Sequence, residues 1–164
     1  MDKPTASASI EIGAPAELVY DIVSDVTRVP DWAAETEQCK WVGGATGAAV
    51  GAKFRGRNRY RTIPWWTTCK VIAAEPARRF AFQVYAGGLP SAQWEYVVEP
   101  TDHGCRVTES TRRQVPKALA GPVNRLLGVR DRDAHNQRNI ESTLTSLKQF
   151  AEARAASARS DAPD

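Results

Sequence analysis

The sequence predicts a single α+β domain, in which a curved antiparallel sheet wraps around a long C-terminal helix. Its 164 residues suit one domain. Between residues 37 and 113, short segments alternate apolar and polar side chains and are separated by turn residues, as in an antiparallel meander. Residues 131–155 instead predict a helix whose buried stripe runs through Asn136, Ile140, Thr143, Leu144, Leu147 and Phe150 or Ala151. We therefore expect about six to seven strands, with two short helices after the first strand.

The first strand is predicted at residues 7–12, where apolar and polar side chains alternate. Pro15 then suits the first turn of a helix. Asp25 and Thr27 offer capping oxygens for a second, short helix that ends near Trp32. The apolar stripe of the first helix is made of Leu18, Val19, Ile22 and Val23.

The other strands are predicted at residues 37–42, 53–61, 65–74, 79–85, 92–99 and 105–113. A Gly- and Ala-rich hairpin connection is expected at 43–51, and the Pro- and Gly-containing segment 117–130 can hold only a short or broken helix. We expect the domain to span residues 7–155, between a disordered N-terminus (1–6) and a disordered C-terminal tail (156–164).

Alternation along the strands predicts which side chains face the helix. In the segment 53–61 every odd position is cationic, so the even positions should face inward. The same reasoning places mainly aromatic and aliphatic side chains of the later strands on the inner face. A curved sheet around one helix tends to enclose a cavity. The candidate ligand-binding residues are Trp32, Phe54, Tyr60, Phe82, Trp94, Tyr96, Thr111, Asn136 and Ile140.

Two polar side chains on the predicted inner face are candidates for catalysis. Glu109 in an apolar cavity would have a raised pKa, which suits a general acid or base. The more common alternative is a glutamate that is solvated or paired with an arginine near the strand end. Asn58 can orient a ligand oxygen or bond across the sheet. His135 is expected to be a surface histidine of the long helix.

The cationic ribbon formed by Lys53, Arg55, Arg57, Arg59 and Arg61 raises the question of nucleic-acid binding. Its own face of the strand lacks the aromatic side chains on which bases stack. Acidic side chains on neighbouring strands would neutralise it as an ordinary sheet surface. We therefore expect no nucleic acid as a partner, and the net charge of +3 is too small to indicate one.

Composition narrows the class of protein further. No segment approaches the ~18 apolar residues of a membrane span, so we expect a cytoplasmic protein without stable membrane insertion, as a monomer or homodimer. Cys39, Cys69 and Cys105 have no C-x-x-C spacing. We expect three free thiols, no metal and no cofactor.

Several short motifs follow one another in a fixed order along residues 7–152. The early block contains Pro15, Val19, Asp25, Arg28, Pro30 and Trp32, and the last helix contains Thr143-Leu144 and Leu147-Lys148. Between them come Trp65-Trp66-Thr67-Thr68, Glu75-Pro76, Arg79 with Phe80-Ala81-Phe82, Trp94-x-Tyr96-x-x-Glu99-Pro100 and Gly104-x-Arg106-Val107-Thr108-Glu109. In this order the chain resembles the START/Bet v 1-like (SRPBCC) helix-grip superfamily, and within it the polyketide cyclase/dehydrase and lipid-transport group. The resemblance implies an internal cavity for lipids, polyketides or other apolar metabolites.

Three functions are therefore expected, in this order. The first is binding of a hydrophobic small molecule, such as a lipid or polyketide, in the internal cavity. The second is a polyketide cyclase or dehydratase activity, with Glu109 and Asn58 as its polar groups. The third is an interaction or stress-related protein that meets a partner through the basic sheet face. Fold resemblance alone does not decide among them.

Overall fold

The structure, a computed structural model, describes residues 3–115 and 132–160. Seven strands form one antiparallel sheet in the order β1-β7-β6-β5-β4-β3-β2. The predicted meander and the number of strands are both confirmed. The strands are β1 (Ala6–Ile12), β2 (Thr36–Val42), β3 (Lys53–Tyr60), β4 (Ile63–Glu75), β5 (Arg79–Ala86), β6 (Leu89–Thr101) and β7 (Gly104–Arg113).

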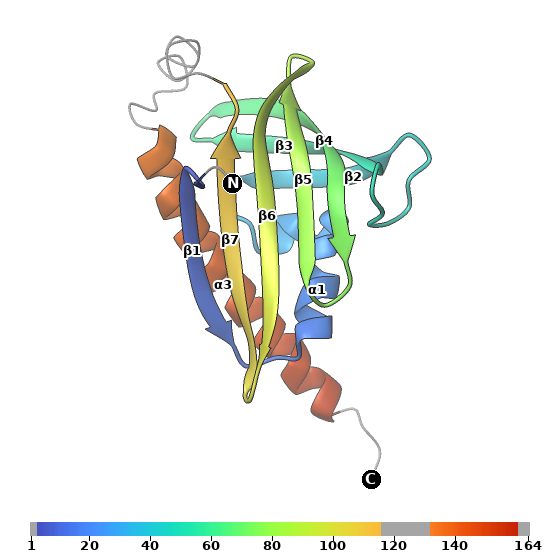
Figure 1. The fold of residues 1–164 in the computed structure, drawn as a ribbon, viewed down its shortest axis with the longest axis vertical. Helices are drawn as coiled ribbons and strands as arrows, with labels where there is room; N and C mark the ends of the chain where they lie inside the picture. Colours follow the sequence, from blue (N-terminus) through green and yellow to red (C-terminus); the bar gives the residue numbers. More distant parts are fainter. Residues whose placement is uncertain (1–2, 116–131, 161–164) are drawn as a thin grey trace.

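The sheet is strongly bent along its length. In Figure 1, β2 and β3 run across the view, while β5, β6, β7 and β1 stand upright, and β4 turns from one direction into the other. The pairing of β4 with β5 is irregular between Val71 and Ala73. An irregularity of this kind increases local twist and bends a strand, so the sheet can curl around the helices behind it.

Two short helices follow β1, as predicted. The α-helix α1 (Ala16–Ser24) begins directly after Pro15. The 3-10 helix η1 (Val26–Asp31) is capped by Asp25, whose side chain accepts a hydrogen bond from the backbone N–H of Thr27 at 3.2 Å. A 3-10 helix is short and tightly wound, and this one leads the chain into the sheet with Trp32 buried at its end.

The long helix α3 (Arg132–Ser160) crosses behind β1 and β7 (Figure 1). It continues through Ser160, whereas a disordered tail was predicted from residue 156, because alanine and arginine in this segment favour helix. At the other end of the chain, Ala6 already belongs to β1. The predicted broken helix at 117–130 lies outside the described residues.

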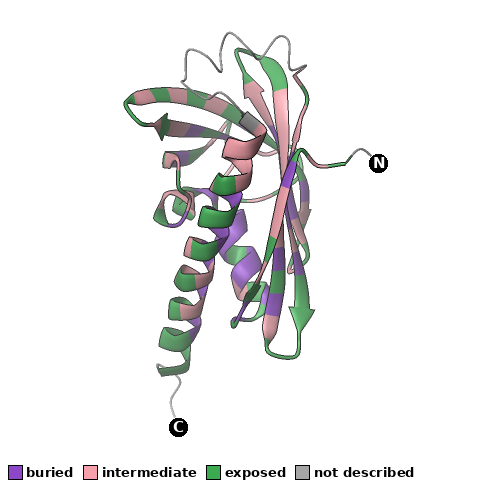
Figure 2. Ribbon diagram, turned by 90° about the vertical axis from the view of Figure 1, so that its left-hand side faces the viewer, coloured by how far each residue is buried: buried purple, intermediate pink, exposed green. Residues whose placement is uncertain are grey.

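The core lies between α3, α1 and the upright strands, where Figure 2 shows the buried residues gathered. The helical stripe predicted for α3 is buried at Ile140, Thr143, Leu144, Leu147 and Ala151. Asn136 and Phe150, from the same predicted stripe, are only half-buried.

Side chains of α3 also bond to the backbone of the edge strand β1. Gln137 accepts from the N–H of Ser7 and donates to its carbonyl, both at 3.1 Å, and Lys148 donates to the carbonyl of Glu11 at 2.8 Å. An uncovered strand edge would offer a template for another chain. The helix therefore covers the sheet edge as well as the core.

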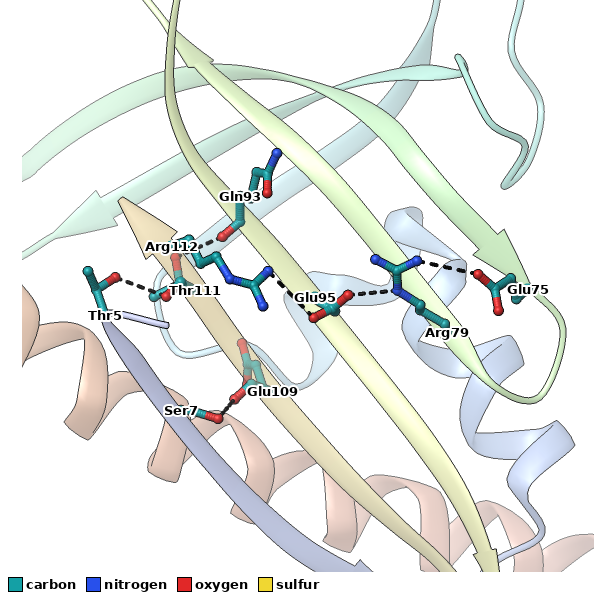
Figure 3. A network of polar contacts seen from close by, with 9 residues as sticks. All are labelled: Thr5, Ser7, Glu75, Arg79, Gln93, Glu95, Glu109, Thr111 and Arg112. Atoms are coloured by element: carbon teal, nitrogen blue, oxygen red, sulfur yellow. Dashed lines mark hydrogen bonds and ion pairs between the residues drawn. The ribbon is translucent and has the colours of Figure 1, made fainter. Parts of the chain in front are cut away.

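On the outer face of the sheet, charged side chains form a row across four neighbouring strands (Figure 3). Arg79 donates to Glu95 at 2.7 Å and approaches Glu75 at 3.4 Å, and Arg112 lies 3.8 Å from the other oxygen of Glu95. We call Glu75, Arg79, Glu95 and Arg112 the outer ladder.

The outer face was predicted to be solvated, but Ala81, Gln83 and Ser110 are buried. Ala81 and Ser110 are small and are shielded by the long charged side chains around them, whereas the Gln83 amide lies on the sheet and donates to the backbone carbonyls of Val84 and Ala92.

Candidate functional site

Glu109 lies on the inner face of β7, directly opposite Tyr96 on β6. The side chain is 2% exposed, and its Oε1 accepts a hydrogen bond from the Tyr96 hydroxyl at 2.8 Å. The prediction that Glu109 faces inward is confirmed. The more common alternative, a solvated or arginine-paired glutamate, is wrong for this position, because β7 places the carboxyl in the middle of the core.

Burial raises the pKa of the Glu109 carboxyl to about 8, although the hydrogen bond from Tyr96 lowers it in part. Burial also raises the pKa of Tyr96 well above its ordinary value, and the carboxyl of Glu109 adds to this. At neutral pH the carboxyl therefore keeps its proton. Because Oε1 accepts from Tyr96, we assign the proton to Oε2, which then acts as a hydrogen-bond donor.

Trp32 contacts the same tyrosine from another side. Its ring meets the Tyr96 ring edge-on, with centroids 6.0 Å apart and planes at 85°. Within the part of the chain that the structure describes, neither Trp32 Nε1 nor Glu109 Oε2 has a hydrogen-bond partner, and both atoms are buried. We call Trp32, Tyr96 and Glu109 the polar centre. A buried polar atom without a partner costs roughly 1–3 kcal/mol, so two of them beside one tyrosine need an explanation.

An aromatic wall continues from the polar centre along the inner face toward β2. Phe54 lies 5.1 Å from Phe82 and 5.7 Å from Trp41, and Phe80 lies 5.7 Å from Phe82, measured between ring centroids. Phe80 and Phe54 are buried, whereas Phe82 is half-buried. These rings fill the bend of the sheet with apolar surface.

Trp94 and Thr111 lie opposite each other on β6 and β7. Thr111 is buried, and its hydroxyl donates to the backbone carbonyl of Gln93 at 3.0 Å. The hydroxyl therefore serves the sheet itself. Trp94 is half-buried on the same inner face, and Ile140 of α3 is fully buried.

Asn58 bonds across the sheet, which is one of the two roles considered for it. Its carbonyl accepts from the Thr36 hydroxyl at 3.1 Å, and its amide donates to the Thr67 hydroxyl at 3.3 Å. In the described residues no hydrogen bond joins Asn58 to Glu109. Its position between β2 and β4 makes it a link within the bent part of the sheet.

His135 is not the surface residue that was predicted. Its Nε2 lies 2.5 Å from a carboxylate oxygen of Glu35, and its ring packs edge-on against Tyr60 with centroids 4.6 Å apart. The side chain is 12% exposed. These residues join the start of α3 to the end of β3 and the segment before β2. Sequence spacing gives no signal for the contact, because the chain positions are far apart.

The three cysteines are free and buried. Burial raises the pKa of Cys39 and Cys69 to about 12 and that of Cys105 to about 11, so none is a ready nucleophile. Among the described residues no group of His, Cys, Asp and Glu side chains could hold a metal ion. No helix within the described ranges has the length and apolar character needed to cross a membrane.

The bent seven-stranded sheet and the long helix behind it define the class of protein, a helix-grip fold. A model of the family described as "Polyketide cyclase / dehydrase and lipid transport" matches residues 3–152. The chain belongs to this family, and the family resemblance inferred from its motifs is confirmed. A comparison with curated proteins found no match.

Solved structures agree with this assignment. The polyketide-cyclase-like protein Cgl2372 from Corynebacterium glutamicum is 33% identical, with a TM-score of 0.62 over 94% of this chain and 95% of that one. Protein CV1439 from Chromobacterium violaceum is 15% identical, with a TM-score of 0.68 over 89% and 96%. The di-domain ARO/CYC StfQ from the steffimycin biosynthetic pathway is 13% identical, with a TM-score of 0.71 over 92% of this chain and 51% of that one. The last two share the fold with this chain.

Proposed function

We propose that the protein binds an apolar small molecule between the inner face of the sheet and α3, and that this ligand carries a hydrogen-bond-accepting oxygen. One observation carries the proposal. The polar centre presents two buried hydrogen-bond donors without partners in the described residues, the protonated Oε2 of Glu109 and Nε1 of Trp32. Two donors in apolar surroundings favour an acceptor such as a ketone oxygen.

The aromatic wall supports the apolar part of the proposed ligand. Phe54, Phe82 and Trp94 line the inner face beside the polar centre, and aromatic side chains pack well against flat ring systems. A polyketide combines flat apolar surface with carbonyl oxygens, whereas a saturated lipid tail offers no acceptor. The pattern therefore favours a polyketide-like ligand, in agreement with the family.

A matched pair of probes tests the proposal. Acetylnaphthalene and ethylnaphthalene share the ring system and are nearly equal in size, and a carbonyl group in the first replaces a methylene group in the second, so only the first can accept from the polar centre. Titration followed by tryptophan fluorescence should give saturable binding of both, with the ketone bound about tenfold more tightly, as expected for one buried hydrogen bond. Native mass spectrometry of freshly purified protein should show a co-purified ligand with at least one carbonyl oxygen.

Variants assign this difference to the polar centre. Trp32→Phe keeps an aromatic ring but removes the N–H donor, and it should reduce the preference for the ketone. Glu95→Gln changes a carboxylate on the outer face of the neighbouring strand and should leave both affinities unchanged. If neither naphthalene binds saturably, the binding proposal fails. If both bind equally, the polar centre does not select the ligand.

A second candidate function is catalysis on the same ligand, as in a polyketide cyclase or dehydratase. The observation that favours it is the pKa of Glu109, which is about 8 and therefore close to the working pH of a cell. Such a carboxyl can donate a proton to a carbonyl oxygen and, once ionised, remove a proton from carbon. Glu109→Gln keeps the shape and removes this proton exchange.

The variant Glu109→Gln distinguishes a protein that only binds its ligand from one that converts it. For a catalyst, Glu109→Gln should abolish turnover of a poly-β-ketone substrate while binding persists. For a carrier, the wild type shows no turnover and the variant still binds the ketone probe. Turnover that survives in Glu109→Gln would remove Glu109 from any catalytic role.

A further inference from the structure

On the outer face of β2, β3 and β4, four exposed cations stand in two like-charged pairs. Lys40 lies directly opposite Arg55, and Lys53 lies directly opposite Lys70. Like charges in directly opposite positions destabilise a sheet. The register places the two members of each pair on adjacent strands and on the same outer face, so we expect each pair to cost some stability.

The acidic side chains nearby are used by other arginines. Glu37 pairs with both Arg57 and Arg59 at the other end of β3, and Glu95 pairs with Arg79. Within the part of the chain that the structure describes, no carboxylate pairs with the four cations. The ribbon predicted along β3 therefore has one carboxylate, shared by Arg57 and Arg59, at one end, whereas Lys53 and Arg55 at the other end have none among the described residues.

The uncompensated end borders a hollow of about 550 Å³. Its floor and walls include the side chains of Lys53, Arg55 and Lys70, together with two aromatic residues, Trp66 and Tyr85. Hollows of a few hundred to a thousand cubic ångströms are the size of small-molecule sites. The absence of aromatic partners, expected from β3 alone, does not hold, because the neighbouring strands β4 and β5 supply them.

Trp66 is 47% exposed, which is unusual for this side chain. The guanidinium group of Arg55 lies 5.3 Å from the centroid of its ring, so a cation and an aromatic surface are held side by side. The hairpin between β5 and β6 turns at Gly87 and Gly88, both with positive φ, and a Cβ on either would meet no atom within 4 Å. Figure 1 shows this hairpin extending past β3 and β4. The hollow is therefore bounded by the turn without being filled by it.

We propose that this hollow binds a small polyanion that carries an aromatic ring, such as a nucleoside triphosphate. The phosphates lie among Lys53, Lys70 and Arg55, and the ring packs on Trp66. The anion removes the repulsion between the paired cations, which explains why the sheet tolerates them. Glu37 offsets part of the charge of Arg57 and Arg59 at the other end of β3, so the positive charge without nearby carboxylates in the described ranges is densest beside the hollow. The site is on the opposite face of the sheet from the polar centre and does not depend on it.

Calorimetric titration with ATP, tripolyphosphate and adenosine tests this proposal. ATP should bind most tightly, tripolyphosphate more weakly and adenosine weakest, and the affinity for ATP should fall as salt is added. ATP should also quench the fluorescence of Trp66 in the wild type, and this component should be absent in Trp66→Phe. Failure of ATP to bind at low salt overturns the proposal.

A pair of double variants on the same strands gives the control. Lys53→Gln with Lys70→Gln should weaken ATP binding by at least about tenfold, because two charges leave the site. Arg57→Gln with Arg59→Gln removes the same formal charge outside the hollow and should change the affinity for ATP by less than about twofold. Equal losses in both double variants would mean attraction by net charge alone and would overturn the site.

Thermal unfolding and the binding of larger anions provide two further tests. Lys70→Gln removes the repulsion with Lys53 and should therefore raise the melting temperature of the protein without ATP. Addition of ATP should raise the melting temperature of the wild type. If Lys70→Gln lowers the melting temperature, the like-charged pair is not the strained feature proposed here. Tighter binding of a single-stranded oligonucleotide, an acidic protein or phosphatidylglycerol vesicles than of ATP would replace the small-molecule site by a docking surface for a macromolecule.

Discussion

Two glutamates on neighbouring strands are both shielded from solvent, but one is ionised and paired with arginines and the other is protonated. Glu95 on β6 faces outward and lies between Arg79 and Arg112, with its side chain 15% exposed. Glu109 on β7 faces inward and is 2% exposed, and among the described residues its carboxyl has the Tyr96 hydroxyl as its one hydrogen-bond partner. Figure 3 shows Glu95 in the row of charged side chains that crosses the strands. The outer carboxylate is compensated by cations, whereas the inner carboxyl keeps its proton.

The comparison teaches that burial alone does not decide the role of a carboxyl. A charge enclosed by arginines stabilises the ionised form and belongs to the architecture. A carboxyl enclosed by apolar groups retains its proton near neutral pH, and it can then donate a hydrogen bond or exchange a proton. Adjacent residues of β6, Glu95 and Tyr96, therefore belong to two different systems, because neighbours on a strand face opposite sides of the sheet.

The largest expected effect is the dependence of the unfolding free energy on pH that the buried carboxyl of Glu109 causes. Burial raises the pKa of Glu109 from 4.5 to about 8, so the folded state binds a proton that the unfolded state releases. The contribution to stability is fully present below pH 4.5 and is lost as pH rises toward about 8, with a slope of at most about 1.4 kcal/mol per pH unit. Denaturant unfolding at a series of pH values measures it.

Glu109→Gln should remove this slope, because the amide does not titrate. The matched variant Glu95→Gln should keep it, since that carboxylate lies on the other face. A wild-type protein whose unfolding free energy is independent of pH between 4.5 and 8 would contradict a protonated Glu109.

An intermediate effect is expected from the tyrosine that connects the polar centre. Tyr96→Phe leaves Oε1 of Glu109 buried without its donor and should cost about 1–3 kcal/mol of unfolding free energy. It should also raise the pKa of Glu109 further, because the bond from Tyr96 lowers it. Tyr85→Phe, on a half-buried tyrosine of the outer face, provides the control and should change stability little. Equal costs for the two variants would mean that the buried hydrogen bond is not special.

The smallest effect is expected in the outer ladder. Glu95→Gln removes the carboxylate shared by Arg79 and Arg112 and should cost at most about 1 kcal/mol, because Arg79 is 42% exposed and solvent screens the pair. The cost should shrink at high salt. Glu75→Gln, at the exposed end of the ladder, should have an even smaller effect. A loss in Glu95→Gln that persists in molar salt would indicate a hydrogen-bonding role rather than an ionic one.

The fold could be predicted from the sequence to a large extent, because its information is local. Alternation along a strand depends only on successive side chains, so the inward direction of Phe54, Tyr96 and Glu109 follows from the residues themselves. The apolar stripe of α3 follows in the same way from helical spacing. The end of the helix was placed too early, since alanine-rich composition suits both a helix and a frayed tail.

The polar centre was only partly predictable. Trp32, Tyr96 and Glu109 were each candidates, but nothing in the sequence says that they meet. The exposed fraction of Glu109 depends on how closely α3 and the neighbouring strands cover it, which is a property of packing. The contact of His135 with Glu35 and Tyr60 likewise depends on where the bend of the sheet carries the end of β3.

The sequence by itself determined the order of the elements, the inner and outer face of each strand and the family. Tertiary structure decided the chemistry of individual groups: which glutamate keeps a proton, which cations find acids and which aromatic residues lie beside them. The physical reason is the range over which each kind of interaction acts. Secondary structure and strand alternation are set by residues a few positions apart, whereas desolvation and charge pairing are set by distances between atoms that the folded sheet brings together.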